Sequence, residues 1–421
     1  MLESVIEGKE LVMKGNILVG QSGGPTTVIN ASLAGVLSAA FNSENIGTVY
    51  GMINGIQGLM DEQLMDMTKE FKGNEKKLEQ LRITPSMFLG SCRYKLKDPV
   101  EDPSDLERVF ELLKKYDIRY FLYIGGNDSM DTVDKVSRYA KEQAYDIKVI
   151  GIPKTIDNDL MEIDHTPGFG SAAKYIATSV LEMAHDTYIY YMQSVMIVEV
   201  MGRNAGWLTA ASVLARNSYN AAPHLIYLPE HPFSTEQFLA DVKAELKKRK
   251  QVIVAVSEGI HDENGEYISA KSTKTDQFGH VMLSGTGKYL ETLVQQEIGC
   301  KVRSVELNVL QRCAAHISSA TDVSEAFHLG EKAVDAVLNG HTDEMTSLRR
   351  ISNSPYRVEY TTVPVSKVAN AEKKIPREWI NEAGNDVTQE LIDYLQPLIE
   401  GEVKVQYEKG IPNYIFKDEQ A

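Results

Sequence analysis

Short apolar runs alternate with amphipathic segments along most of this chain, and this alternation constrains its fold more than any other feature. The runs at 16–20 (NILVG), 118–124 (IRYFLYI) and 147–152 (IKVIGI) indicate buried strands. The segments at 26–41 and 129–143 indicate the helices that follow the first two strands. Further strand-like runs lie at 194–200, 224–229 and 251–257. Because such alternation is typical of βαβ units, we predict an α/β fold with mostly parallel sheets.

Composition places the chain among globular proteins. Its 421 residues suffice for two or three domains, and its net charge of −15 disfavours binding to nucleic acid or to anionic membranes. No apolar run reaches the roughly 18 residues of a membrane span. The charged residues 1–16 show no signal-peptide core, and Cys92, Cys300 and Cys313 lack CxxC spacing. We therefore expect a cytoplasmic protein with reduced thiols.

Polar loops follow several of the predicted strands. In open α/β sheets, ligands bind beyond the carboxyl ends of the strands, so these loops are the candidate binding segments. They are 20–27 (GQSGGPTT), 125–130 (GGNDSM), 153–159 (PKTIDND), 201–207 (MGRNAGW) and 257–260 (SEGI).

Two of these loops combine glycines with a predicted helix start. Gly23 and Gly24 let backbone N–H groups approach a phosphate, although the loop matches neither common phosphate-binding motif and is also compatible with a tight turn. In the second loop, Asp128 and Ser129 are typical helix caps. The alternative is a phosphate loop in which Asn127 helps to place Mg²⁺. Both interpretations are compatible, because a capped helix start also attracts anions.

The loop PKTIDND carries the strongest chemical pattern. Asp157 and Asp159 are two residues apart and follow Lys154 and Thr155. In an extended stretch, Thr155, Asp157 and Asp159 point to the same side. One carboxylate can then accept a proton while the other orients it or lies near a metal, and Lys154 can neutralise phosphoryl charge. A solvated loop is the alternative.

Other polar residues are weaker candidates on their own. Arg203 lies on a glycine-flanked turn, and Glu258 occupies the matching place after another strand. Arg303 and Arg312 are nine residues apart, but spacing alone does not separate them from surface arginines. His316 is better explained as a packed or surface histidine than as a catalyst.

In order along the chain, these segments resemble the phosphofructokinase family from about residue 16 to about residue 330. The resemblance rests on GQSGGPTTVINA, FLGSCR, GGNDS, PKTIDND, VEVMGRNAG, SEGI and LNVLQR. It implies two Rossmann-like α/β domains with the active site in the cleft between them. The expected donor-binding domain comprises 1–168 plus about 311–365. The expected sugar-phosphate domain comprises 169–310 plus about 366–421, including a C-terminal extension.

The resemblance also implies the residues of the sugar side. The catalytic residues that the resemblance implies are Asp157, Lys154, Asp128 and Arg203. In the implied reaction, Asp157 takes the proton from the sugar 1-hydroxyl. The substrate-binding residues it implies are Thr155, Asp159, Met201, Gly202, Glu258, Arg312 and, from a neighbouring subunit, Arg303. A shared site of this kind implies a homodimer or homotetramer. Ser194 and Val309 depart from the family's usual residues and weaken the implied 6-phosphate contacts.

On the donor side, the implied contacts are Gly24, Arg93, Gly126 and Ser129, with Asn127 near Mg²⁺. Members that use ATP usually have glycine where this chain has Asp128 and Lys154. A carboxylate about 4 Å from a nucleotide phosphate adds bulk and a repulsion of roughly 1 kcal/mol in water or about 4 at a dielectric of 20. Lys154 can grip pyrophosphate. Together, Asp128 and Lys154 resemble the pyrophosphate-dependent branch.

The expected reaction is Mg²⁺-dependent, reversible phosphoryl transfer from pyrophosphate to fructose 6-phosphate, giving fructose 1,6-bisphosphate and phosphate in glycolysis or gluconeogenesis. An ATP-dependent 6-phosphofructokinase is the close alternative, and sedoheptulose 7-phosphate is an alternative acceptor. A non-catalytic sugar-phosphate sensor would not need the base Asp157. A dinucleotide-binding oxidoreductase is disfavoured, because no strand is followed by GxGxxG with an acidic residue about 20 positions later.

Overall fold

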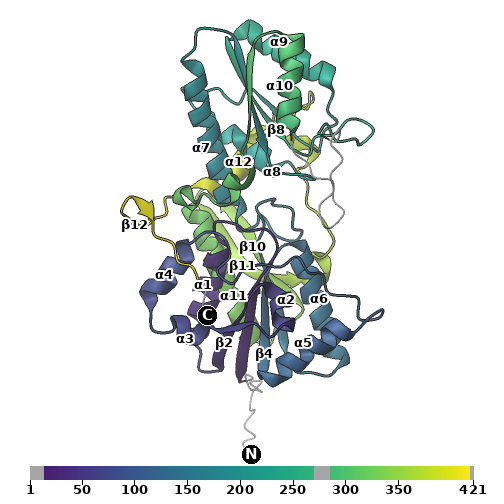
Figure 1. The fold of residues 1–421 in the computed structure, drawn as a ribbon, viewed down its shortest axis with the longest axis vertical. Helices are drawn as coiled ribbons and strands as arrows, with labels where there is room; N and C mark the ends of the chain where they lie inside the picture. The colour runs from purple at the N-terminus through teal and green to yellow at the C-terminus, as the bar shows by residue number, and fades with distance from the viewer. Residues whose placement is uncertain (1–13, 270–284, 418–421) are drawn as a thin grey trace, which may run out of the picture.

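The computed structural model describes residues 14–269 and 285–417, so the expectation for the extreme N-terminus lies largely outside the described residues. The molecule is elongated and has two lobes, each built around its own sheet (Figure 1). The α/β fold with mostly parallel sheets is confirmed. Within the described ranges, no helix is both long and apolar enough to cross a bilayer.

The lower lobe in Figure 1 contains a seven-stranded sheet in the order β11-β10-β5-β4-β1-β2-β3. Its central strands β1, β4 and β5 are parallel and mostly buried, and apolar residues point to both of their faces. Val19 and Leu122, which pair across β1 and β4, are fully buried. The antiparallel β3 and β11 close its edges. The strands are β1 (Gly15–Gln21), β2 (Ile46–Met52), β3 (Leu64–Asp66), β4 (Ile118–Gly125), β5 (Lys148–Pro153), β10 (Glu344–Asn353) and β11 (Tyr356–Pro364).

The upper lobe contains a four-stranded parallel sheet in the order β7-β8-β6-β9. Its strands are β6 (Ser194–Val200), β7 (Leu225–Tyr227), β8 (Gln251–Ser257) and β9 (Lys301–Glu306). β6 and β8 are buried, whereas β9 is an edge strand with mostly exposed side chains. An exposed edge strand is an open hydrogen-bonding surface.

Helices cover the faces of both sheets. The closest helix pair, α1 and α11, needs glycine on both sides: a Cβ at Gly35 would lie 1.9 Å from Phe327 O, and one at Gly330 would lie 2.1 Å from Ser32 O. The helices of the lower lobe are α1 (Ile29–Phe41), α2 (Gly55–Met60), α3 (Met67–Phe71), α4 (Glu75–Ile83), α5 (Ser104–Lys115), α6 (Asn127–Glu142) and α11 (Ala320–Leu338). Those of the upper lobe are α7 (Phe169–Tyr188), α8 (Trp207–Ala211), α9 (Thr235–Lys248), α10 (Thr286–Glu297) and α12 (Gln389–Leu395).

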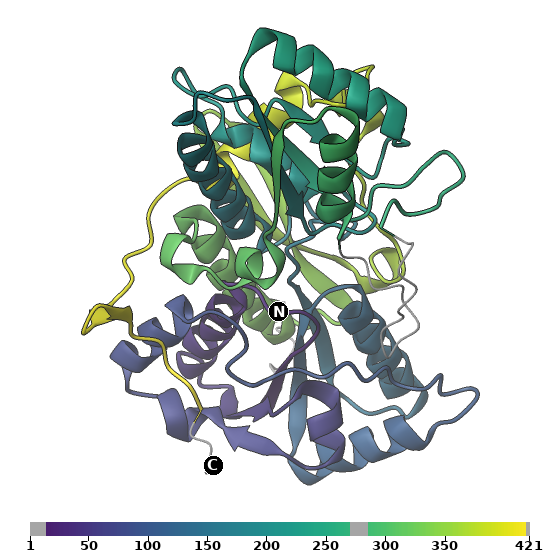
Figure 2. The same ribbon diagram turned by 45° about the horizontal axis from the view of Figure 1, so that its top comes forward.

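The C-terminal segment contacts both lobes in turn, as the yellow trace of Figures 1 and 2 shows. Val368 packs in the lower core, and Ile375 and Leu391 pack in the upper core. After the small hairpin of β12 (Tyr407–Glu408) and β13 (Ile411–Pro412), Ile415 N donates to Thr84 Oγ1 in the lower lobe at 3.1 Å. The two sheets fall in the ranges expected for two domains; the exact division stays a prediction.

Candidate active site

A cavity of about 380 Å³ lies at the carboxyl ends of the strands, between the loops of the two sheets. The loops after β1, β5, β6 and β8 all contribute to it, as the rule for parallel sheets predicts. Its lining is Gly24, Pro25, Arg93, Lys154, Thr155, Ile156, Asp157, Asp159, Met201, Gly202, Arg203, Asn204, Ala205, Glu258, Arg312 and Glu372. Most residues singled out from the sequence therefore meet in one place, although their individual roles stay predictions.

The loop after β5 has a different backbone from the one expected. Asn158 has a left-handed φ of 54°, so the prediction of an extended stretch from Thr155 to Asp159 is wrong. The chain turns because Thr155 Oγ1 accepts the N–H of Asp157 at 3.1 Å and Asn158 Oδ1 accepts the N–H of Thr166 at 3.0 Å. Both carboxylates nevertheless line the cavity.

The acidic residues of the cavity are poorly solvated. Burial raises the pKa of Asp157. Burial, assisted by the charge of Asp157, raises the pKa of Asp159 to about 7. Burial also raises the pKa of Glu258 to about 7. The protein alone thus does not stabilise three full negative charges here, and at least one carboxylate is suited to accept a proton near neutral pH.

Two cations, Lys154 and Arg312, approach the glycine loop at Gly23 and Gly24. Lys154 Nζ donates to Gly24 O at 2.7 Å. Burial lowers the pKa of Lys154 to about 8, although Asp157 and Asp159 oppose the shift. A Cβ at Gly23, where φ is +80°, would lie 3.1 Å from Lys154 Nζ, and one at Gly24 would lie 3.3 Å from Arg312 Nη1. The left-handed φ of Gly23 favours glycine, and two cations approach this loop closely, an arrangement suited to phosphate groups.

The loop after β6 is held in one conformation. Gly202 N donates to Glu258 Oε1 at 3.3 Å, and Ser257 Oγ donates to Gly202 O at 2.6 Å. Gly202 has a φ of +136°, and a Cβ there would lie 2.6 Å from Ala205 O. Met201 N donates to Gln311 Oε1 at 3.3 Å. These bonds fix the wall next to Arg203.

The loop after β4 lies outside the cavity lining. Ser129 is buried and its Oγ lies 2.5 Å from Ser22 Oγ, which ties this loop to the loop after β1. The side chain of Asp128 is 91 % exposed, and its Oδ1 lies 4.0 Å from Lys95 Nζ. Gly126 precedes them at the start of α6. Asp128 thus lies outside the cavity lining, with its carboxylate in water.

Asn127 faces the C-terminal segment. With its amide nitrogen turned toward two carbonyls, it donates to Val368 O and Ala371 O at 3.2 Å each. In residues 14–269 and 285–417, no group of three or more His, Cys, Asp or Glu side chains is arranged to hold a metal. The donor set therefore fits Mg²⁺ only if substrate phosphate oxygens supply most of its ligands, as is usual for this ion.

Arg303 does not line the cavity. It lies on β9 in a separate groove of about 760 Å³, together with Lys288, Val305 and Leu310. Its predicted contact with the 6-phosphate would therefore have to be made in a neighbouring subunit.

The cavity contains two polar residues that sequence reasoning missed. Glu372, from the C-terminal segment, accepts hydrogen bonds from Asn204 Nδ2 at 3.1 and 3.2 Å. Asn204 lies within a recognised motif and could have been included. Glu372 lies beyond the motifs, and no local pattern distinguishes it from a surface glutamate.

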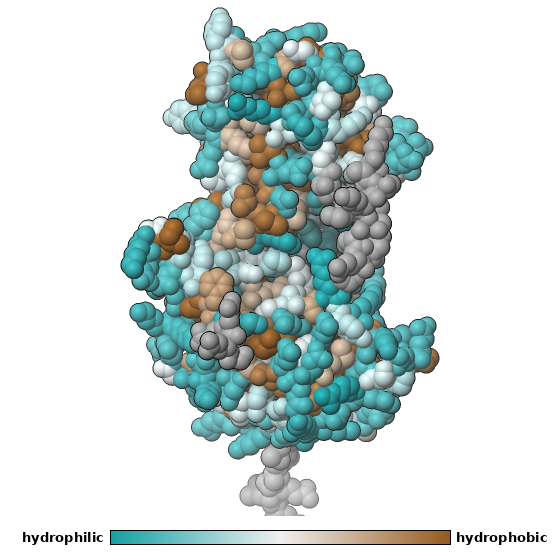
Figure 3. Space-filling model, viewed as in Figure 1, coloured by the Kyte–Doolittle hydropathy of each residue, from teal (hydrophilic) through white to brown (hydrophobic). Residues whose placement is uncertain are grey.

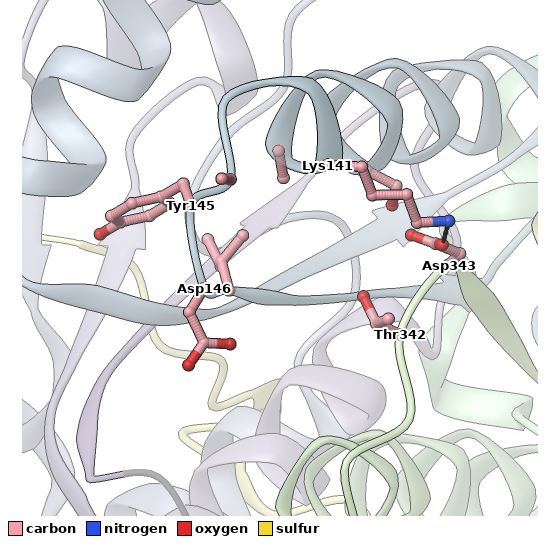
Figure 4. Close-up of a pocket in the computed structure, with 9 residues that line it drawn as sticks. Lys141, Tyr145, Asp146, Thr342 and Asp343 are labelled. Atoms are coloured by element: carbon pink, nitrogen blue, oxygen red, sulfur yellow. Dashed lines mark ion pairs between the residues drawn. The ribbon is translucent and has the colours of Figure 1, made fainter.

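A smaller cavity of about 160 Å³ lies at the opposite end of β5 (Figure 4). Tyr145 and Asp146 line it just before the strand, and an ion pair between Lys141 and Asp343 borders it. Thr342 accepts the N–H of Val149 at 3.0 Å through its hydroxyl. This place at the amino ends of the strands argues for a structural joint rather than a binding site.

Comparison with known proteins agrees with the geometry. Residues 16–337 match the family model described as Phosphofructokinase. The chain is 42 % identical to the pyrophosphate–fructose 6-phosphate 1-phosphotransferase of Halomonas elongata, over 94 % of both chains. It is 43 % identical to the protein of that name from Xanthomonas campestris, over 95 % of this chain and 96 % of the other. The crystal structure of a pyrophosphate-dependent phosphofructokinase from Marinobacter aquaeolei is similar, with a TM-score of 0.85 and 40 % identity over 95 % of both chains.

Proposed function

The chain belongs to the phosphofructokinase family, and we propose that it transfers a phosphoryl group from pyrophosphate to the 1-hydroxyl of fructose 6-phosphate. The products are fructose 1,6-bisphosphate and phosphate. The observation that carries the proposal is the position of Asp157 and Lys154 on one loop, opposite the glycine loop at Gly24, in a cavity that both lobes line. The names of the relatives support pyrophosphate as the donor.

Asp157 is the general base of the proposed reaction. Its carboxylate accepts the proton of the sugar 1-hydroxyl as that oxygen attacks the near phosphorus in line. Burial raises the pKa of Asp157, and a raised pKa matches a base that operates near neutral pH. Thr155 Oγ1 lies 3.4 Å from Asp157 Oδ2 and orients the carboxylate.

Cations offset the charge of the two phosphate-bearing substrates. Lys154, Arg203 and Arg312 all line the cavity. When pyrophosphate binds, its charge raises the pKa of Lys154 and so stabilises the ammonium form, because nearby anions favour a cation. Catalysis of phosphoryl transfer depends mainly on such positioning and charge stabilisation. Met201, Gly202 and Glu258 form the sugar wall of this arrangement.

We place Mg²⁺, the cofactor of this proposal, near Asn127 Oδ1. Bound there, the ion would offset phosphate charge and help to orient the donor. Asn127 brings no charge of its own, so binding of the ion depends on pyrophosphate.

The exposed face of β9 supports a homo-oligomer, and we propose that Arg303 acts in a neighbouring subunit. Hydrophobic side chains gather on the upper lobe between α7 and α10 (Figure 3). Exposed apolar residues on β9 and directly after it are Val305, Val309 and Leu310. A patch of this kind beside an open strand edge is typical of a subunit interface. Association of two subunits through this surface would place Arg303 next to the neighbouring subunit.

The free thiols are compatible with a cytoplasmic enzyme, which remains part of the proposal. Cys92, Cys300 and Cys313 form no disulfide. Such free cysteines are typical of reducing compartments.

The reverse reaction tests this function. Pyrophosphate and a phosphate ester are close in energy, so the enzyme is expected to form pyrophosphate from fructose 1,6-bisphosphate and inorganic phosphate with Mg²⁺. A coupled pyrophosphate assay measures this product. An ATP-dependent enzyme would need ADP instead of phosphate, and a non-catalytic sensor would give no product; either result would contradict the proposal.

A further inference from the structure

The C-terminal segment 368–373 lies against the loops that are proposed to bind the donor and to carry the base. With its amide nitrogen turned toward this segment, Asn127 donates to Val368 O and Ala371 O at 3.2 Å each. Two residues later, Lys373 N donates to Asp159 O at 2.7 Å. This short segment therefore contacts both the start of α6 and the loop after β5.

The ammonium of Lys373 makes all of its hydrogen bonds to the segment that follows β5. Its Nζ donates to Asp164 O at 2.7 Å, to Ile163 O at 3.1 Å and to Asn158 Oδ1 at 3.3 Å. An ammonium has three N–H donors, so these acceptors match its capacity. Taking an ammonium out of water is costly unless such partners are present. Lys373 therefore holds the backbone of this segment through hydrogen bonds and is not a solvated surface lysine.

Lys373 contacts Asn158, the residue that sets the turn of the loop carrying Asp157. Asn158 lies between Asp157 and Asp159 and has the left-handed φ of 54°. Its Nδ2 donates to Tyr394 Oη at 2.9 Å, and Tyr394 Oη donates to Asp164 O at 2.7 Å. Lys373 and Tyr394 thus hold the same turn from two directions.

Lys373 also reaches the upper lobe. Its carbonyl accepts the N–H of Trp207 Nε1 at 3.0 Å, and its Nζ lies 5.4 Å from the centre of the Trp207 ring. Trp207 begins α8, directly after the loop that carries Arg203. One residue therefore connects the base loop of one lobe to the sugar wall of the other.

We propose that Lys373 is a positioning residue for phosphoryl transfer: its backbone N–H and its ammonium fix the turn at Asn158 and thereby hold the Asp157 carboxylate toward the substrate cavity. The proposal rests on the proposed function, in which Asp157 is the base. Displacement of a catalytic group by about 1 Å can cost about 10²-fold in rate, so loosening this turn should be visible in turnover. Burial lowers the pKa of Lys373 to about 8, which fits a side chain enclosed by protein.

The test compares three full-length variants with the wild type: Lys373→Met, Asp157→Ser and the double variant. Lys373→Met is expected to lower kcat by about 10- to 100-fold, with KM for fructose 6-phosphate and pyrophosphate changed less than about threefold. If Lys373 acts through Asp157, the double variant is expected to stay within about threefold of Asp157→Ser alone, because groups that act as a unit are non-additive.

Two further variants separate positioning from folding. Lys374→Met changes the neighbouring exposed lysine and is expected to retain wild-type kcat. Tyr394→Phe removes the second contact to Asn158 without deleting a charge, and about a three- to tenfold loss of kcat with unchanged KM is expected. If Lys373→Met does not fold, Tyr394→Phe still tests whether loosening the turn at Asn158 lowers kcat.

Three results would overturn the inference. They are wild-type kcat in both Lys373→Met and Tyr394→Phe, a loss expressed in KM instead of kcat, and a loss that multiplies in full with that of Asp157→Ser. Failure of the proposed function would be seen in the wild type itself, as absent turnover with pyrophosphate.

Discussion

Lys154 donates a hydrogen bond from its ammonium to the carbonyl oxygen of Gly24 at 2.7 Å, and this bond joins the loop after β5 to the glycine loop after β1. The two loops are 130 residues apart in the chain. Their contact places a cation against backbone that approaches phosphate closely, with the Asp157 carboxylate three residues away on the same loop. The chemistry of the site follows from this pairing of cation, glycine loop and base.

Replacing the base tests its role directly. Asp157→Ser is expected to lower kcat by about 10²–10⁴, the usual contribution of a general base, with little change in KM. Steady-state kinetics with pyrophosphate measure both quantities. Asp157→Asn is the matched control, since it keeps the shape of the side chain and should lose a similar factor. A variant that retains most of its turnover would remove Asp157 from the mechanism.

Charge and bulk at position 128 can be separated. Asp128 is 91 % exposed, so its repulsion of a nucleotide phosphate should lie near the aqueous limit of about 1 kcal/mol, or about fivefold. Asp128→Asn, which keeps the bulk, is expected to raise kcat/KM for ATP by no more than this factor. Asp128→Gly should raise it further. Equal gains in both variants would show that bulk contributes nothing.

In the pH profile of kcat/KM, the acid limb should lie above the usual pKa of an aspartate and the basic limb below the usual pKa of a lysine. Asp157 must be ionised to accept a proton, so activity falls as pH decreases through its raised pKa. Lys154 must be protonated to bind phosphate, so activity falls as pH increases through its lowered pKa of about 8. Glu372 adds to the raised pKa of Asp157, and Glu372→Gln should move the acid limb to lower pH. An acid limb near pH 4 in the wild type would contradict this picture.

His165 should make stability depend on pH. Burial by itself lowers its pKa, but Glu325 at 2.6 Å and Asp164 at 2.7 Å outweigh burial and raise the pKa to about 9. Its contribution is therefore fully present below about pH 6.5 and is lost as pH rises through about 9. Urea unfolding of wild type and His165→Gln across this range measures the difference. Parallel stability curves would show that His165 is not charged in the folded protein.

Subunit mixing tests whether Arg303 acts in the partner. In a dimer with shared sites, hybrids of Arg303→Ala and Asp157→Ser subunits contain one site with both defects and one intact site. Random exchange should restore about a quarter of wild-type activity from two nearly inactive proteins. No recovery, with hybrid formation verified by mass, would place Arg303 outside the shared site.

The parallel-sheet pattern predicted β1, β4, β5, β6, β7 and β8 and the loops that follow them, because runs buried on both faces are recognisable and ligands gather at their carboxyl ends. It did not predict β2, β3, β9, β10 or β11, and the side chains of β9 and β11 are mostly exposed or half-exposed. It did not predict the turn at Asn158, whose conformation depends on Thr166, Tyr394 and Lys373. Glu372 was missed for the same reason. Its place depends on a tertiary path of the C-terminal segment that no local pattern encodes.

The most direct test of the account is a comparison of kcat/KM for pyrophosphate and for ATP in the wild-type enzyme, with saturating fructose 6-phosphate and Mg²⁺. The account predicts a preference for pyrophosphate of about tenfold or more, from the combined charge and bulk of Asp128 and the contact with Lys154. Equal use of the two donors, or a preference for ATP, would contradict it.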